Sequence, residues 1–141
     1  KQEKKAQQEL KLLDNALEKI LTLTTDAFEF DDARTASQVE PLEQVIDILV
    51  ERLRAQHIKR LKDGVCSIDT GVVYLDVLSN AERISDHCSN IAARLVGMEA
   101  GEDYDSHTLK NMMHHNPTKE YMLNYEQCRK DYLIPLEQLE A

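Results

Sequence analysis

Two pairs of acidic residues in this sequence have a spacing that would let their carboxylates act together, for example in binding a cation. Glu43 and Asp47 are four residues apart, and Glu82 and Asp86 repeat the same spacing. Because residues four apart lie on one face of a helix, each pair would form a negatively charged ridge if its segment is helical. Carboxylate oxygens suit hard cations such as Mg²⁺, Ca²⁺ or Mn²⁺, and a multinuclear carboxylate cluster can also hold iron.

The surroundings of the second pair leave two interpretations open. Polar residues that could serve as secondary ligands lie close by in the sequence: Asp76, Asn80, His87 and Asn90. The alternative is that the acidic residues are only solvated, because charged residues on the polar face of a helix usually are. A neighbouring arginine could also pair with a carboxylate and leave no place for a metal. Spacing alone does not decide between a cation site and a solvated face.

The segments that would position these pairs have helical periodicity. Apolar residues recur three and four residues apart over long stretches, no stretch alternates as a strand does, and only 4 Gly and 3 Pro interrupt the chain. The expected fold class is therefore all-α, a single domain (residues 1–141) built as an antiparallel up-down bundle of three long helices plus a C-terminal helix. The expected helices cover residues 3–29, about 32–63, 68–96 and the stretch from Asn116-Pro117 toward Leu139, with a short helix near 108–113.

Local signals refine the ends of these helices. Asp31 or Asp32 can cap the second helix, and Pro41 predicts a kink or a loop at residues 38–40. Gly64 is placed to end that helix. Pro135 predicts a kink in the last one.

The third helix has the most regular apolar pattern in the chain. Its residues recur in a heptad-like rhythm that predicts a buried seam: Val73, Val77, Ala81, Ile84, Cys88, Ile91 and Leu95. If this helix folds back on the second one near Gly64, positions equidistant from the turn face each other. Glu43 would then lie level with Asp86, and Asp47 with Glu82.

Composition narrows the function classes. A formal charge of −9 argues against a nucleic-acid or anionic-membrane partner, and no apolar run approaches the length that spans a bilayer. Three cysteines without a C-x-x-C pair fit a reducing compartment and a soluble protein. No Gly-rich phosphate loop, nucleophile elbow or Glu-x-x-His motif is present, so a binding or regulatory module is expected instead of an enzyme. The first residue is Lys1, which suggests a piece of a longer protein.

Three stretches resemble a known family. Residues 81–92 (AERISDHCSNIA) resemble the helix signature of the PhoU family of phosphate-transport regulators, and residues 43–47 (EQVID) resemble its companion acidic motif. Residues 57–61 (HIKRL), followed by Gly64 and Cys66, resemble the PhoU-like domain at the cytoplasmic C-terminus of bacterial sodium/phosphate cotransporters. The resemblance is clear over residues 40–96.

The resemblance has specific implications. It implies a multinuclear metal cluster of iron or zinc on Glu43, Asp47, Glu82 and Asp86, although Ser85 stands where the family usually has glycine. Because the regulators hold two such repeats and this chain holds one, it also implies a homodimer. The expected function is a cytoplasmic, membrane-tethered regulatory domain that restrains phosphate uptake by contact with a membrane phosphate transporter, in cis or in trans. The alternative is a free-standing metal-binding bundle.

Overall fold

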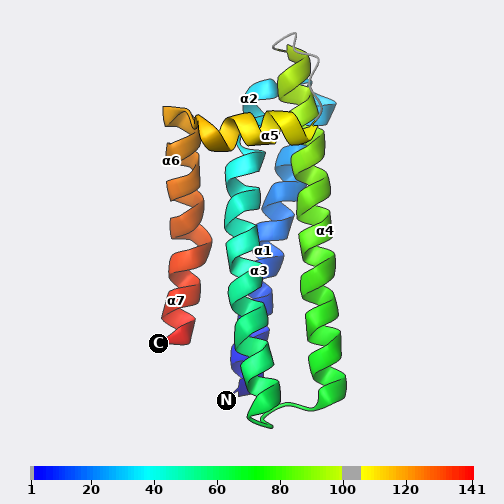
Figure 1. Cartoon of the computed structure of the whole chain (residues 1–141), viewed down its shortest axis with the longest axis vertical. Helices are drawn as coiled ribbons and strands as arrows, with labels where there is room; N and C mark the ends of the chain where they lie inside the picture. The colour runs from blue at the N-terminus through cyan, green and yellow to red at the C-terminus, as the bar shows by residue number, and fades with distance from the viewer. Residues whose placement is uncertain (1, 100–105) are drawn as a thin grey trace.

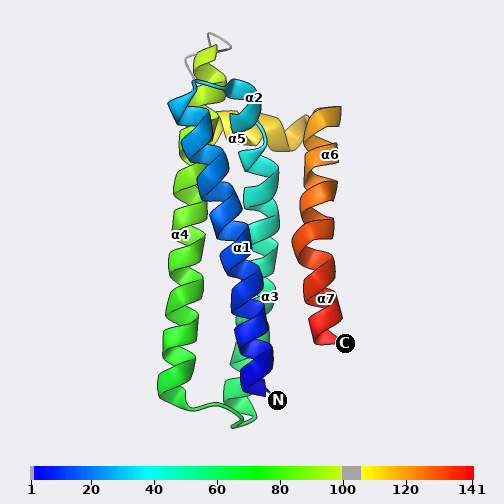
Figure 2. The same cartoon turned by 180° about the vertical axis from the view of Figure 1, so that it is seen from behind.

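The computed structural model describes residues 2–99 and 106–141, and within these ranges it is helical without strands, as predicted (Figure 1). Three long helices, α1, α3 and α4, pack against one another as a bundle, in which α3 runs antiparallel to both α1 and α4 (Figure 2). α6 and α7 form a fourth rod on the side of α1 and α3 that lies away from α4, and α5 crosses one end of the bundle. The helices are α1 (Gln2–Glu29), α2 (Ala33–Ala36), α3 (Val39–Lys62), α4 (Ile68–Glu99), α5 (Ser106–His115), α6 (Lys119–Cys128) and α7 (Ile134–Glu140).

The predicted second helix is two helices in the structure. Asp32 caps the short α2, because its side chain accepts hydrogen bonds from the backbone N–H groups of Arg34 and Thr35 at 3.1 and 3.2 Å. α3 then begins at Val39, which places Pro41 in its first turn. Backbone N–H groups of a first turn have no intrahelical partner, so proline costs no hydrogen bond there. The sequence predicted one helix from about residue 32 with a kink or a loop at residues 38–40, whereas the structure has two helices separated at residues 37–38.

The turn between α3 and α4 is built as predicted around Gly64. Its φ of +69° lies in the left-handed region, where glycine meets no Cβ penalty. Gly64 N–H donates to the carbonyl of Leu61 at 3.2 Å, and Val65 N–H donates to that of Arg60 at 3.1 Å. These two bonds are the Schellman motif that closes a helix. They fold α4 back beside α3 and fix the register between the two helices.

The seam predicted for α4 was partly wrong. Ala81 and Cys88 are buried, but Val73, Val77, Ile84 and Ile91 keep 63%, 41%, 38% and 43% of their surface exposed. The face that packs on α1 and α3 carries mostly small side chains, which let the helices approach closely: Ala81, Ser85, Cys88, Ser89, Ala92 and Ala93, with the larger Tyr74 and Leu78. The large β-branched residues are therefore left beside the core and not in it.

The C-terminal rod, formed by α6 and α7, differs from the prediction at its start and in its middle. Thr118 is the N-cap of α6 and accepts from the N–H of Tyr121 at 3.0 Å, so Pro117 lies just outside the helix. Residues Arg129–Leu133 form a π-helical turn before α7. Pro135, which lacks an N–H, explains this turn, because the normal i→i−4 bond cannot form there. Where the sequence predicted a kink at Pro135, the structure thus has a π-helical turn just before it. Tyr125 and Tyr132 pack partly buried against the core.

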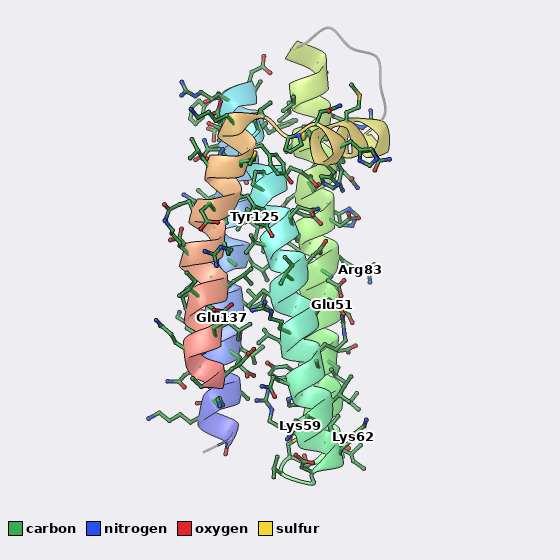
Figure 3. All side chains as sticks on the ribbon, turned by 60° about the vertical axis from the view of Figure 1, so that its left-hand side comes forward. Glu51, Lys59, Lys62, Arg83, Tyr125 and Glu137 are labelled. Atoms are coloured by element: carbon green, nitrogen blue, oxygen red, sulfur yellow. The ribbon has the colours of Figure 1, made fainter. Side chains whose placement is uncertain are left out.

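One further contact, the extents of α4 and α5, and one absence complete the description of the fold. Arg52 of α3 and Glu137 of α7 form an ion pair with an N–O distance of 3.3 Å, which ties the fourth rod to the bundle (Figure 3). α4 continues through Gly97 to Glu99, and the predicted short helix is the longer α5, so His114 and His115 are helical and not in a loop. None of the described helices is long and apolar enough to cross a membrane.

Candidate functional site

The fold brings the two predicted acidic pairs to one face shared by α3 and α4. Ser89 of α4 donates a hydrogen bond from its hydroxyl to Glu40 of α3. Glu40 lies three residues before Glu43, and Ser89 lies three residues after Asp86, so this bond sets Glu43 level with Asp86. The same register sets Asp47 level with Glu82. We call the five acidic residues of this face the carboxylate cluster: Glu40, Glu43, Asp47, Glu82 and Asp86.

Glu43 is the most perturbed acid of the carboxylate cluster. Only 4% of its surface is exposed. Burial raises its pKa to about 9, and hydrogen bonding to Asp47 and the negative charges of Glu40 and Asp47 act in the same direction. Gln44 donates an amide hydrogen bond to Glu43 at 3.2 Å. Glu43 therefore holds a proton at neutral pH in the metal-free protein.

The pKa of Asp47, at the centre of the cluster, is raised for similar reasons. Burial raises its pKa most, and the carboxylates of Glu82, Asp86 and Glu40 raise it further, while the hydrogen bond with Glu43 lowers it. Since these neighbours act on Asp47 from both helices, the two acidic ridges converge as the hairpin geometry requires. Asp47 and Glu43 have no ion pair among the described residues.

Three basic side chains surround the edges of the carboxylate cluster. Arg54 of α3 forms ion pairs with Glu82 and with Glu51, its neighbour three residues away (Figure 3). Lys110 of α5 lies 3.3 Å from a carboxylate oxygen of Asp86 and equally close to the amide oxygen of Asn90.

The third edge contact comes from His114, also on α5. Its Nε2 lies 2.8 Å from a carboxylate oxygen of the buried Glu40. Two of the three edge groups thus belong to α5, the helix that crosses this end of the bundle. These two side chains connect α5 to the carboxylate cluster.

The carboxylate oxygens of the cluster are of the type that binds a hard cation. Their positions in this structure, however, do not form a ligand sphere. All five groups offer carboxylate oxygens, which bind Mg²⁺, Ca²⁺, Mn²⁺ or iron more readily than a thiol or imidazole site would. Yet within residues 2–99 and 106–141 no group of three or more His, Cys, Asp or Glu side chains is gathered closely enough to hold a metal ion. A cation bound here would have to take Glu82 from Arg54 and Asp86 from Lys110.

The predicted secondary ligands fall into two groups. Asn90 reaches the cluster through Lys110, which bridges it to Asp86. Asp76, Asn80 and His87 are exposed on α4 and do not join the cluster. At about 100° per residue they lie on the side of α4 that faces away from α3. His57 is buried far from the carboxylate cluster, near the α3–α4 turn.

Several residues of this site were not found from the sequence. Glu40 could have been, because it lies three residues before Glu43 and so shares its helix face. Lys110 and His114 carried no such signal, since only the path of the chain beyond α4 brings α5 over the cluster. Arg54 reaches Glu82 across the hairpin and was hidden for the same reason.

A cavity of about 360 Å³ opens beside the cluster between α3 and α6. Burial raises the pKa of Tyr121, one of its lining residues, and the negative charges of Glu40 and Glu43 raise it further. Tyr121 therefore stays protonated, with a hydroxyl available as a donor. The cavity is lined by Gln44, His114, Pro117, Tyr121, Met122, Tyr125 and Glu126.

Comparison with known proteins identifies the family. The sequence model of the PhoU domain matches residues 10–95, which include both acidic pairs and the turn between them. The chain belongs to the PhoU domain family. It is 26% identical over 95 residues to a protein of Thermotoga maritima named phosphate-specific transport system accessory protein PhoU homolog 1, an alignment that covers 67% of this chain and 41% of that protein.

A second relative carries the same kind of name. The phosphate-specific transport system accessory protein PhoU homolog of Streptococcus pneumoniae is 34% identical over 79 residues, which are 56% of this chain and 37% of that protein. This PhoU domain thus spans about two fifths of the length of the curated relatives it matches. No solved structure matches it. Lys110 and His114 lie beyond the matched residues 10–95, so the family match does not include the contacts from α5.

Proposed function

We propose that this PhoU domain is a regulatory module of phosphate transport, which acts by binding a membrane phosphate transporter and not by catalysis. Its family membership supports the proposal, as do relatives named as accessory proteins of phosphate-specific transport systems. The finer form is the cytoplasmic C-terminal domain of a sodium/phosphate cotransporter, for which the HIKRL stretch at residues 57–61 argues. The domain would restrain phosphate uptake through contacts of its helix faces.

The carboxylate cluster is the observation that carries the regulatory part of this proposal. Glu43 is buried and Asp47 is half-buried; both have raised pKa values, and neither has an ion pair in the described residues. Bringing like charges together in this way is unfavourable unless a proton or a cation neutralises them. A hard cation (Mg²⁺, Mn²⁺, Ca²⁺ or iron) held by Glu43, Asp47, Glu82 and Asp86 would supply that charge.

The contacts from α5 suggest how a bound cation could alter the surface. Lys110 pairs with Asp86, and His114 pairs with Glu40. A cation that binds Asp86 competes with Lys110 for the same oxygen, so its arrival weakens the hold on α5. The end of the bundle would then present a different surface to the transporter. Cation occupancy and partner contact are coupled through this helix.

Isothermal titration calorimetry tests the cation site directly. Mg²⁺, Ca²⁺ and Mn²⁺ are titrated into the wild-type chain and into the Asp47→Ala and Asp86→Ala variants, with Asp26→Ala, an exposed acid of α1, as the matched control. We expect binding in the wild type and in the control and its loss in both cluster variants. Weak binding that is unchanged in both cluster variants would exclude the site.

A transport assay tests the regulatory role. Phosphate uptake is measured in cells that carry the full-length protein with wild-type Asp47 or with Asp47→Asn, which keeps the shape of the side chain. We expect uptake to become less responsive to external phosphate in the variant, at equal protein level. Identical uptake in both strains would contradict the proposal.

The alternative function is a free-standing metal-binding or storage-like bundle, since the carboxylate cluster would bind a cation equally well without a transporter. The two functions separate on the encoding reading frame. A cotransporter domain requires several stretches of ~20 apolar residues upstream of Lys1. A free bundle requires none, and its cation binding would persist without any effect on uptake.

A further inference from the structure

Ser85 of α4 is a buried polar side chain that lacks a hydrogen-bond partner. It is 0% exposed, and in the part of the chain that the structure describes its hydroxyl oxygen is the one fully buried side-chain oxygen or nitrogen left without a bond. A buried hydroxyl without a partner costs free energy, because it gives up its bonds to water and gains none. Such exceptions are rare in folded proteins, and a group that binds an ion is one of the known reasons for them.

The backbone of α4 does not satisfy this hydroxyl. A serine or threonine inside a helix can donate to the carbonyl four residues back, as Thr24 of α1 does to Ile20 at 2.8 Å. Ser89, one turn beyond Ser85, donates instead to Glu40 across the contact between α3 and α4. Ser85 makes neither kind of bond, although it is as deeply buried as Ser89. Among the described helices its hydroxyl thus stays open to another partner.

Ser85 lies on the face of α4 that meets α3. Residues four apart share a helix face, and Ser89 reaches Glu40 of α3 from the next turn. The register that this bond sets places Ser85 level with the turn of α3 between Glu43 and Asp47. These are the two acids at the centre of the carboxylate cluster.

Depth distinguishes Ser85 from the acids on either side of it in α4. The side chains of Glu82 and Asp86 are 38% and 60% exposed, whereas Ser85 is fully buried. On this helix the two acids therefore form the solvent side of the carboxylate cluster, and Ser85 forms its inner wall. The unpaired hydroxyl lies where the cluster meets the core.

We propose that the Ser85 hydroxyl is a further ligand of the cation site, to which it offers a neutral oxygen from the core side of the carboxylate cluster. The inference rests on the proposed cation site and adds a residue to it. A hydroxyl oxygen is a hard ligand that Mg²⁺ accepts in proteins, and it adds no charge to a cluster that already holds five acids. Glycine, usual in the family at this position, would offer no oxygen, so this ligand depends on the serine of this chain.

Calorimetry of the 141-residue chain tests the ligand. Mg²⁺ and Mn²⁺ are titrated into the wild type, Ser85→Ala, Asp47→Ala and the control Cys88→Ala. Cys88 is a small buried residue of the same helix, but its thiol lies toward Thr24 of α1, which packs beside α4 (Figure 2). We expect Ser85→Ala to weaken binding by about tenfold or more, as loss of a supporting group at a metal site does, and Cys88→Ala to bind as the wild type does.

The outcomes separate this inference from the site on which it rests. Binding that is lost in Asp47→Ala but unchanged in Ser85→Ala would overturn the role of Ser85 and leave the cation site in place. A wild type that binds neither cation would overturn both.

Stability without a cation distinguishes a ligand from a packing residue. Ser85→Ala removes an unpaired hydroxyl and introduces a residue of higher helix propensity. In the presence of a chelator this variant should therefore unfold at a urea concentration at least as high as the wild type does. A serine needed only for packing would give the reverse, so a lower urea midpoint for Ser85→Ala would count against the proposal.

Exchange of oxygen for sulfur tests direct contact with the cation. Ser85→Cys replaces a hard ligand with a soft one, so the ratio of Cd²⁺ affinity to Mg²⁺ affinity should rise by about tenfold or more. The wild type is the reference, because it carries the same three native cysteines. An unchanged ratio in Ser85→Cys would show that residue 85 does not touch the cation.

Discussion

One buried carboxylate, Glu9, and the partly buried carboxylate cluster lie toward opposite ends of the α3–α4 hairpin, and their negative charges are balanced in different ways. Near the α3–α4 turn, the buried Glu9 is bound by both terminal nitrogens of Arg60 and by the hydroxyl of Tyr74 at 2.9 Å. Arg60 Nε also donates to His57 Nδ1 at 3.2 Å, and the His57 ring stacks on Tyr74 with centroids 3.9 Å apart. Here a single negative charge meets a matched set of partners.

At the other end, the carboxylate cluster gathers five acids, and its two central ones have raised pKa values in place of ion pairs. A buried acid with a dedicated arginine can be explained by stability alone. Buried acids that repel one another cannot, because the arrangement costs free energy. The comparison separates a structural network from the cluster for which a cation is proposed, and it assigns the HIKRL histidine and arginine to the structural network.

The largest effect is expected at the structural end. Arg60→Met removes the partner of Glu9 and leaves a buried unpaired carboxylate, which should lower the free energy of unfolding by about 3–5 kcal/mol. Urea denaturation followed by circular dichroism measures this change. The double variant Glu9→Gln/Arg60→Met should recover part of the loss. A loss below about 1 kcal/mol for Arg60→Met would show that the ion pair does not hold this end together.

The opposite sign is expected for an acid of the carboxylate cluster. Because the pKa of Glu43 rises from its ordinary 4.5 to about 9 on folding, the folded protein keeps a proton that the unfolded chain loses in that interval. Stability from this group is therefore complete below pH 4.5 and is lost as the pH rises toward 9. Glu43→Gln, measured with a chelator at pH 8, should be more stable than the wild type by about 1 kcal/mol or more, the equivalent of at least one pKa unit.

The control for this prediction is Glu9→Gln, which should destabilise the protein at the same pH because it weakens the bonds to Arg60. If both substitutions destabilise the protein equally at pH 8, the contrast between the two ends is false.

A smaller effect is expected at the edge of the cluster. Arg54 pairs with Glu82, and both are partly exposed, so Arg54→Gln should change the free energy of unfolding by no more than about 1 kcal/mol. The same change frees a ligand and removes a positive charge, so it should tighten cation binding several-fold in calorimetry. Weaker binding in Arg54→Gln would mean that Glu82 is not a ligand.

The smallest effect concerns α5. Saturating Mg²⁺ competes with Lys110 for Asp86, so backbone amides of residues 110–115 should exchange hydrogen faster in its presence, while those of α3 slow down. Hydrogen exchange read by mass spectrometry measures both. Uniform slowing of α5 and α3 would contradict the coupling between the cation and this helix.

Features that depend on neighbouring residues in the chain, such as turns and helix faces, could be predicted from the sequence. Gly64 marked the turn, the four-residue spacings marked the acidic faces, and the position of the turn gave their relative level. Pro41 predicted a kink or a loop at residues 38–40, next to the actual break at residues 37–38, but the four-residue length of α2 was not predicted, because the Asp32 cap signals only where a helix starts. The α4 seam was misplaced, since periodicity shows that an apolar face exists but not which partner covers it. Contacts between distant segments, such as Glu9 with Arg60 or Lys110 with Asp86, leave no local pattern.

The most direct test of the account is the titration of the Glu43 side-chain carboxyl, followed by carbon NMR in the folded protein. In the presence of a chelator, the account predicts a midpoint close to 9, with the neighbouring Asp47 also titrating above its usual range. With saturating Mg²⁺ or Ca²⁺, the Glu43 midpoint should fall by several units as the cation replaces the proton. An ordinary midpoint near 4.5 without a cation, unchanged when one is added, would contradict the claim that this cluster is held ready for a cation.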